Sequence, residues 1–105
     1  MLKKSHRLPI QYFQKGKAIK RIEPPLAVYI AASPLPHSRF GVVVSKAVYK
    51  EATKRIALRR TIFRIIAERK WNAKPGRDIL IYVLPAIDKK ISVSLLSLAL
   101  QRALS

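Results

Sequence analysis

The chain has 105 residues, enough for one domain, and half of them are hydrophobic. This composition allows a buried core and excludes a disordered basic tail. Lys and Arg total 22 against 5 Asp and Glu, which gives a formal net charge of +17. Such a charge repels itself in the compact state, so it predicts a polyanionic partner, with nucleic acid as the first candidate. A membrane surface is the rival, but it usually binds a basic amphipathic helix.

The absence of cysteine excludes disulfides, thiolate metal sites and cysteine nucleophiles. Residues 1–7 are polar and basic, but no apolar region follows them, so we predict no export signal. The longest apolar stretches are shorter than the roughly 20 residues that a membrane span needs. We therefore expect a single domain over residues 1–105 with a basic arm at 1–7, located in the cytoplasm and not associated with a membrane.

The first half of the chain predicts a short helix followed by three strands. Residues 8–15 favour a helix that has a proline in its first turn and a glycine after its end. Strands are expected at 18–22, 26–32 and 39–45, where apolar and β-branched residues lie between proline-containing breaks. Because a short loop joins the last two strands, we predict that they form an antiparallel pair.

The second half predicts a long helix over about 52–70, a central strand over 78–84 and a last helix over 92–103. The strand is a nearly continuous apolar run, which is typical of a central strand. Helical spacing predicts that the core-facing residues are Leu58, Ile62, Ile65 and Ile66, flanked by Ile56 and Phe63, and then Leu95, Leu96, Leu98 and Ala99. The element order αβββαβα predicts an α+β fold, a two-layer sandwich with helices packed on one sheet.

Side chains that could support catalysis by the protein itself are scattered along the chain. The acids are Glu23, Glu51, Glu68, Asp78 and Asp88, and no two have a spacing that suggests a carboxylate pair or a metal cage. His6 falls in the arm and His37 in a loop, and a lone loop histidine is more often solvated than catalytic. We predict no catalytic residue and no metal ligand in this chain.

Basic residues recur every few positions over 45–64, across a strand end, a loop and a helix N-terminus. The dipole at a helix N-terminus favours anions, so cations crowded there are unfavourable unless a phosphate completes the site. We expect Arg60 and Arg64 on the outer side of the helix. Arg55 and Arg59 lie one turn apart on its flank and are expected to reach outward together. This pattern favours contact with RNA or DNA over a merely solvated basic face.

Aromatic residues fall on the predicted first helix and on the predicted sheet. Single-stranded nucleic acid is often held by aromatics on a sheet face inside a basic groove. For Phe40 we favour a core position, whereas spacing leaves both readings equal for Phe13 and Tyr29. Trp71, at the end of the long helix, is interpreted as a packing anchor.

These segments together resemble the protein component of bacterial ribonuclease P over nearly the whole chain. The most specific match is the sequence RFGVVVSK at 39–46. The others are FQKGK at 13–17, the arginine-rich residues of 52–60, PGRDILI at 75–81 and the leucine-rich last helix. No single segment decides the resemblance, but their order and spacing do.

The resemblance implies a mixed four-stranded sheet with a left-handed βαβ crossover, a rare exception to the usual handedness. It implies a catalyst made of RNA with bound Mg²⁺, no cofactor on the protein alone, and no protein partner. The protein would bind this RNA and the 5′ leader of precursor tRNA, improve substrate affinity and lower the Mg²⁺ demand. The implied contacts to the RNA subunit are Lys46, Lys54, Arg55, Arg59, Arg60 and Arg64. The implied leader contacts are Phe13, Lys17, Tyr29 and Arg39.

The chain departs from the family pattern at several positions. The family motif usually has Asn and then Arg directly after Arg55, where this chain has Ile56 and Ala57. A glycine-asparagine pair is usual where this chain has Lys50 and Glu51. An aromatic near the start of the first helix is replaced by residues 9–10, Pro-Ile.

Two other functions remain as alternatives to a ribonuclease P subunit. They are a small basic ribosomal or ribosome-assembly protein and, more weakly, a binder of double-stranded DNA.

Overall fold

The computed structural model describes residues 7–8, 13, 18–23, 25–33, 36–71, 76–85 and 93–104. In chain order, the elements are β1 (Ile19–Glu23), β2 (Leu26–Ala32), β3 (Arg39–Val44), α1 (Ala52–Glu68), β4 (Arg77–Val83) and α2 (Val93–Leu104). These bounds lie within two residues of the predicted ones. The helix predicted over 8–15 falls largely outside the described residues, and the two residues of it that are described, Leu8 and Phe13, are not helical.

The four strands form one mixed sheet in the order β1-β2-β4-β3. β4 pairs antiparallel with β2 and parallel with β3, so the prediction of a central strand is confirmed. The predicted pairing of residues 26–32 with 39–45 is wrong, because β4 lies between them. β4 can take this place because consecutive residues on both of its faces are buried, namely Ile79, Leu80 and Ile81.

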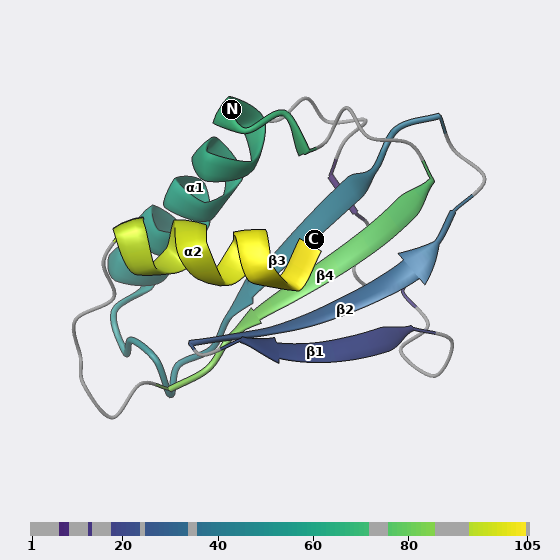
Figure 1. Ribbon diagram of the computed structural model, residues 1–105. Coiled ribbons are helices and arrows are strands. Elements are labelled where there is room, and N and C mark those ends of the chain that lie inside the picture. The colour runs from purple at the N-terminus through teal and green to yellow at the C-terminus, as the bar shows by residue number, and fades with distance from the viewer. Residues whose placement is uncertain are drawn as a thin grey trace.

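The crossover connection from β3 through α1 to β4 is left-handed, which is rare for a βαβ unit. When the molecule is turned so that β3 and β4 point up and the two helices face the viewer, β4 lies to the left of β3 (Figure 1). A right-handed crossover would place β4 to the right. The expected left-handed crossover and the α+β sandwich are therefore present.

One face of the sheet packs against both helices and forms the core. Val28, Ile81 and Val42 lie side by side across β2, β4 and β3 and are almost completely buried. α1 covers them with the predicted stripe of Leu58, Ile62, Ile65 and Ile66. Phe40 is fully buried in this core and Trp71 packs against it, as predicted.

α2 crosses the same face of the sheet (Figure 1) and buries a stripe different from the predicted one. Its buried residues are Leu96, Ala99, Leu100, Ala103 and Leu104. Leu95 and Leu98 are 41% and 45% exposed, so their predicted core positions are wrong. Ile56 of α1 is likewise 40% exposed rather than part of a second buried stripe. Phe63, the other predicted flanking residue, is partly buried against the core. α2 therefore turns the side that carries Leu100 and Ala103 toward the sheet, rather than the side that carries Leu95 and Leu98.

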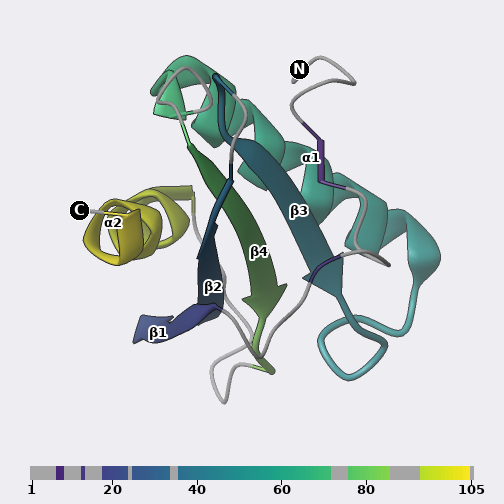
Figure 2. The ribbon, with the colours of Figure 1, turned by 90° about the vertical axis from the view of Figure 1, so that its right-hand side faces the viewer.

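A short N-terminal segment lies along the outer edge of β3. The backbone N–H of Leu8 donates to the carbonyl oxygen of Phe40 at 2.9 Å, and Arg7 forms a parallel bridge with Phe40. Figure 2 shows this segment beside β3. Leu8 is buried there. The contact fixes residues 7–8 to the sheet edge, close to the first residues of β3.

Candidate nucleic-acid interface

Four cations of α1 are exposed around the side of the helix that is turned away from the core, namely Lys54, Arg59, Arg60 and Arg64, and we call them together the basic helix surface. Lys54 Nζ lies 3.6 Å from a carboxylate oxygen of Glu51, and Arg64 Nε lies 3.9 Å from one of Glu68. All four side chains are well exposed, so these ion pairs contribute little stability. The helix surface therefore keeps a positive charge that can attract phosphates.

Arg55 does not reach outward beside Arg59, so that prediction is wrong. Its Nη1 donates to the backbone oxygens of Tyr49 at 2.9 Å and of Lys50 at 2.7 Å. The reason is in the spacing, since Arg55 lies three residues before Leu58 on the buried stripe of the helix. Arg55 thus ties the start of α1 to the preceding loop, and its role in RNA contact stays a prediction.

Residues 45–51 form a connecting loop between the end of β3 and α1. The loop turns back on Ser45, whose carbonyl oxygen accepts from the N–H of Val48 at 3.1 Å. Lys46, an implied RNA contact, is exposed in this loop. Glu51 is the N-cap residue, but its side chain makes no capping hydrogen bond, and the first turn of α1 contains no acid. A helix end of this kind attracts an anion through its N–H groups and dipole.

The face of the sheet turned away from the helices is called the outer face. It carries two tyrosines and one lysine, Tyr29, Tyr82 and Lys20, which we call the aromatic cluster. Tyr29 and Tyr82 alternate with core residues of β2 and β4, and Lys20 pairs with Tyr29 across β1 and β2. The rings of Tyr29 and Tyr82 meet edge to face, with centroids 5.7 Å apart and an interplanar angle of 73°. Lys20 Nζ lies 5.6 Å from the centroid of the Tyr29 ring. Both geometries are attractive, so the cluster holds the Tyr29 ring in a defined orientation.

A hollow of about 320 Å³ lies beside this cluster. Its lining includes Lys20, Ala27, Tyr29, Val43, Ser45, Tyr82 and Pro85. Because Ser45 also begins the connecting loop, the hollow adjoins the loop that leads to the basic helix surface. The outer face and the basic helix surface belong to different layers of the sandwich and meet through residues 45–51.

The other implied leader contacts are not part of this hollow. Arg39 lies at the opposite end of the outer face and donates to Asp78 through Nε at 2.9 Å and Nη2 at 2.8 Å. The hydrogen bond to Asp78 raises the pKa of Arg39 further, against a smaller lowering by burial. Phe13 is half-buried, and Lys17 lies outside the described residues. Their contacts to a leader stay predictions.

Sequence reasoning missed Lys20 and Tyr82. Lys20 belongs to a strand of five residues that is almost entirely exposed, so no apolar alternation marked its face. Tyr82 interrupts the otherwise aliphatic run of β4 with a polar aromatic side chain. That interruption was the available signal, because a tyrosine in a buried strand usually keeps its hydroxyl near solvent.

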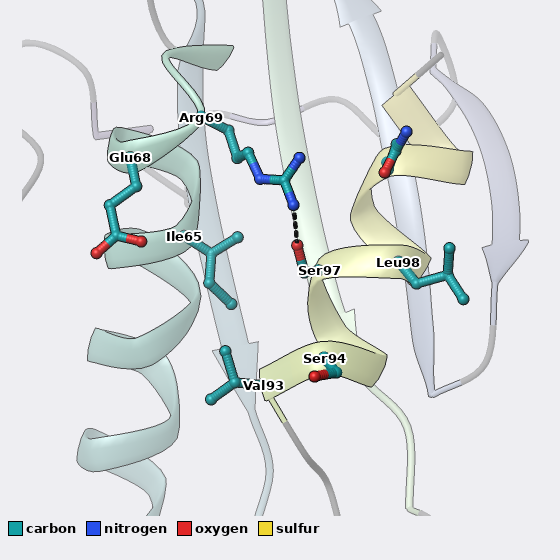
Figure 3. A pocket seen from close by; sticks show the side chains of 8 residues that line it. Ile65, Glu68, Arg69, Val93, Ser94, Ser97 and Leu98 are labelled. Carbon is teal, nitrogen blue, oxygen red and sulfur yellow. Dashed lines mark hydrogen bonds between the residues drawn. The ribbon is translucent and has the colours of Figure 1, made fainter.

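A second hollow, of about 430 Å³, lies on the helical side between the end of α1 and α2 (Figure 3). Ile65, Val93 and Leu98 give it apolar walls. Arg69 Nη2 donates to Ser97 Oγ at 3.1 Å across the hollow, which links the two helices. This hollow is remote from the outer face of the sheet, since the core separates them.

Within the described part of the chain, no group of three or more His, Cys, Asp or Glu side chains could hold a metal ion. None of the helices described has the length and apolar character needed to cross a membrane.

Comparison with known proteins identifies the family of this α+β domain, which carries the basic helix surface and the aromatic cluster of the outer face. Residues 3–105 match the model of the family described as Ribonuclease P. The chain therefore belongs to the ribonuclease P protein family, and the resemblance seen in the sequence is confirmed. Membership in this family favours the ribonuclease P hypothesis over the ribosomal-protein and DNA-binding alternatives.

A curated relative, the ribonuclease P protein component of a Synechocystis species, is 49% identical over 49 residues. That stretch is 47% of this chain and 40% of the relative, so the match spans less than half of that protein. The fold is similar to the RNase P protein from Thermotoga maritima, with a TM-score of 0.78, 20% identity and coverage of 93% and 94% of the two chains. It is also similar to the RNase P protein of Staphylococcus aureus, with a TM-score of 0.79, 20% identity and coverage of 96% and 94%.

Proposed function

We propose that this chain is the protein subunit of a cytoplasmic ribonuclease P that removes the 5′ leader from precursor tRNA. In this proposal the RNA subunit and its Mg²⁺ ions carry out catalysis, and the chain binds RNA. The observation that carries the proposal is the arrangement of two different surfaces. One is a basic helix surface with little compensating charge, and the other is an aromatic cluster on the opposite layer of the sandwich.

The basic helix surface would bind the catalytic RNA. Its arginines offer planar groups with several donors, which suit bidentate contact with phosphate. Each phosphate neutralised releases counterions, so the affinity would fall steeply with salt. Cations placed between two RNAs also offset the repulsion between them, which is how the subunit would lower the Mg²⁺ demand. Lys46 and the start of α1 would extend this contact along the connecting loop.

The outer face would hold the single-stranded leader. Aromatic side chains accept any base by stacking, and a nearby cation tracks the backbone, so the grip needs little sequence preference. Tyr29 fits this role because its ring is half-exposed and is held by Lys20 and Tyr82. A leader bound there would pass close to Ser45 and so approach the catalytic RNA on α1.

The test is reconstitution with the ribonuclease P RNA from the same source at low Mg²⁺. We expect the chain to stimulate leader removal and to make the complex bind precursor tRNA more tightly than mature tRNA. Stimulation that is absent, together with equal affinity for the two tRNAs, would reject the proposal. The intact chain is used throughout, with bovine albumin of equal concentration as the control for non-specific protein effects.

A further inference from the structure

We infer that the hollow beside Tyr82 is a site for one unpaired nucleotide, in which Tyr82 supports the base and Lys20 binds the adjoining phosphate. The inference rests on the proposed function and goes beyond it, because it defines one nucleotide position and two residues that the resemblance did not supply. Its basis is the size, the lining and the charge of the hollow.

The size of the hollow limits its occupant. A volume of about 320 Å³ lies at the lower end of the range of small-ligand sites, roughly 300–1,000 Å³. It is too small for a duplex but suits one base with its sugar. The space exists because Ala27 stands opposite Tyr82 in the register of β2 and β4, where a larger side chain would fill it. The hollow is therefore a consequence of one small residue between larger ones.

The lining of the hollow matches the two ends of a nucleotide. Tyr29, Tyr82 and Val43 give it flat or apolar surfaces suited to a base. Lys20 Nζ, on the β1 side, rests over the Tyr29 ring without an ion pair to any described acid. Its ammonium can turn to a phosphate at small cost, because a cation–π contact at an exposed site is weak.

The charge of the surroundings favours a polyanion over a free neutral ligand. Lys20 stands at one side of the hollow, and Lys46 follows Ser45 at the other. A strand that placed one base in the hollow would meet a cation on each side. The site thus fits a nucleotide inside a chain, with the next phosphate directed toward the connecting loop and the N-terminus of α1.

The test combines abasic substitutions in the leader with protein variants in the reconstituted holoenzyme. Removing one base at a time should reveal one leader position whose loss weakens precursor affinity about 10-fold, within the range measured for base stacking on aromatics. In Tyr82→Ala this position should lose its effect, while abasic changes elsewhere keep theirs. Tyr82→Phe, which keeps the ring, should behave like the natural chain.

Variants of Lys20 test the nucleotide site independently of Tyr82, because the exposed side chain of Lys20 can be changed without risk to the fold. Lys20→Met should reduce the salt slope of leader-dependent affinity by about one ion, and Lys20→Arg should restore it. If the abasic penalty persists unchanged in Tyr82→Ala, or if Lys20→Met leaves the slope unaltered, the nucleotide site is rejected. The proposed function would still stand in that case, provided that the natural chain stimulates leader removal.

Discussion

The outer face and the basic helix surface bind the same kind of polymer by different means. On the outer face, three side chains constrain one another through ring contacts at 5.6 and 5.7 Å, so the surface is already formed without RNA. On α1, the exposed cations have only weak partners at 3.6 and 3.9 Å. The first surface would bind RNA mainly by shape and stacking, with a charge contribution from Lys20, and the second would bind it by charge.

This difference predicts different responses to salt. Stacking on a preformed aromatic is largely insensitive to ionic strength, whereas phosphate contacts weaken steeply as counterions compete. The connecting loop joins the two surfaces, since Arg55 fixes the loop carbonyls to α1 while Ser45 lines the hollow. Variants of the outer face and variants of the basic helix surface should therefore separate the stacking contribution to affinity from the electrostatic one.

The largest effect is expected from the double change Arg59→Ala and Arg60→Ala. Losing two phosphate contacts should weaken binding to the RNA subunit about 100-fold at moderate salt and lower the salt slope by about two ions. Filter binding over a salt series measures both quantities. Arg102→Ala, which removes one exposed cation from α2, is the control and should leave the affinity within about twofold. Equal losses in the control would mean that only net charge matters.

The next effect is expected from Tyr29→Ala. Losing a stacking ring should weaken affinity for precursor tRNA about 10-fold and leave mature tRNA unaffected. The salt slope should stay the same, in contrast to the arginine variants. Tyr29→Phe keeps the ring and should retain affinity. A similar loss with mature tRNA would remove Tyr29 from the leader site.

Arg55→Ala should show a mixture of structural and binding effects. Its guanidinium satisfies two backbone oxygens, so removal should lower the free energy of unfolding by about 1–3 kcal/mol. Affinity for the RNA subunit should fall less than in Arg59→Ala, and Arg55→Lys should recover part of the stability. Chemical denaturation alongside filter binding separates the two. An Arg55→Ala chain of natural stability would show that the loop contact is unimportant.

The smallest effect is expected from Arg39→Gln, which breaks the ion pair with Asp78. The pair is partly buried, and its loss should cost about 1 kcal/mol of stability. Because the pKa of Arg39 is raised on folding, its contribution persists below its ordinary pKa and is lost only as the pH rises through the raised value. The stability difference between the two chains should therefore stay constant from pH 6 to pH 9 in thermal melts. A loss of leader affinity at unchanged stability would instead make Arg39 a leader contact.

The sequence predicted local structure well and long-range structure less well. The bounds of β2, β3 and α1 follow from apolar spacing and proline breaks, which act over a few residues. The pairing of β2 with β4 could not be derived in that way, because it depends on which distant strand is apolar on both faces. The resemblance, rather than the pattern, supplied the left-handed crossover.

The candidate site was predicted in outline only. Arg59, Arg60 and Arg64 lie on the exposed side of α1, as their spacing indicated. The inward turn of Arg55 and the bond of Arg39 to Asp78 depend on partners that no local pattern showed. The hollow formed around Ala27 depends on strand register, which fixes the small residue opposite Tyr82.

The measurement that tests the central claim most directly is a double-mutant cycle between Arg59→Ala and Tyr29→Ala in the reconstituted holoenzyme. Affinity for precursor tRNA and affinity for the RNA subunit are measured for both single variants and the double variant. Two separate surfaces predict that the free-energy losses add within about 0.5 kcal/mol, with Arg59 affecting mainly RNA-subunit binding and Tyr29 mainly precursor binding. Strong coupling, or both variants weakening the same equilibrium equally, would contradict the account.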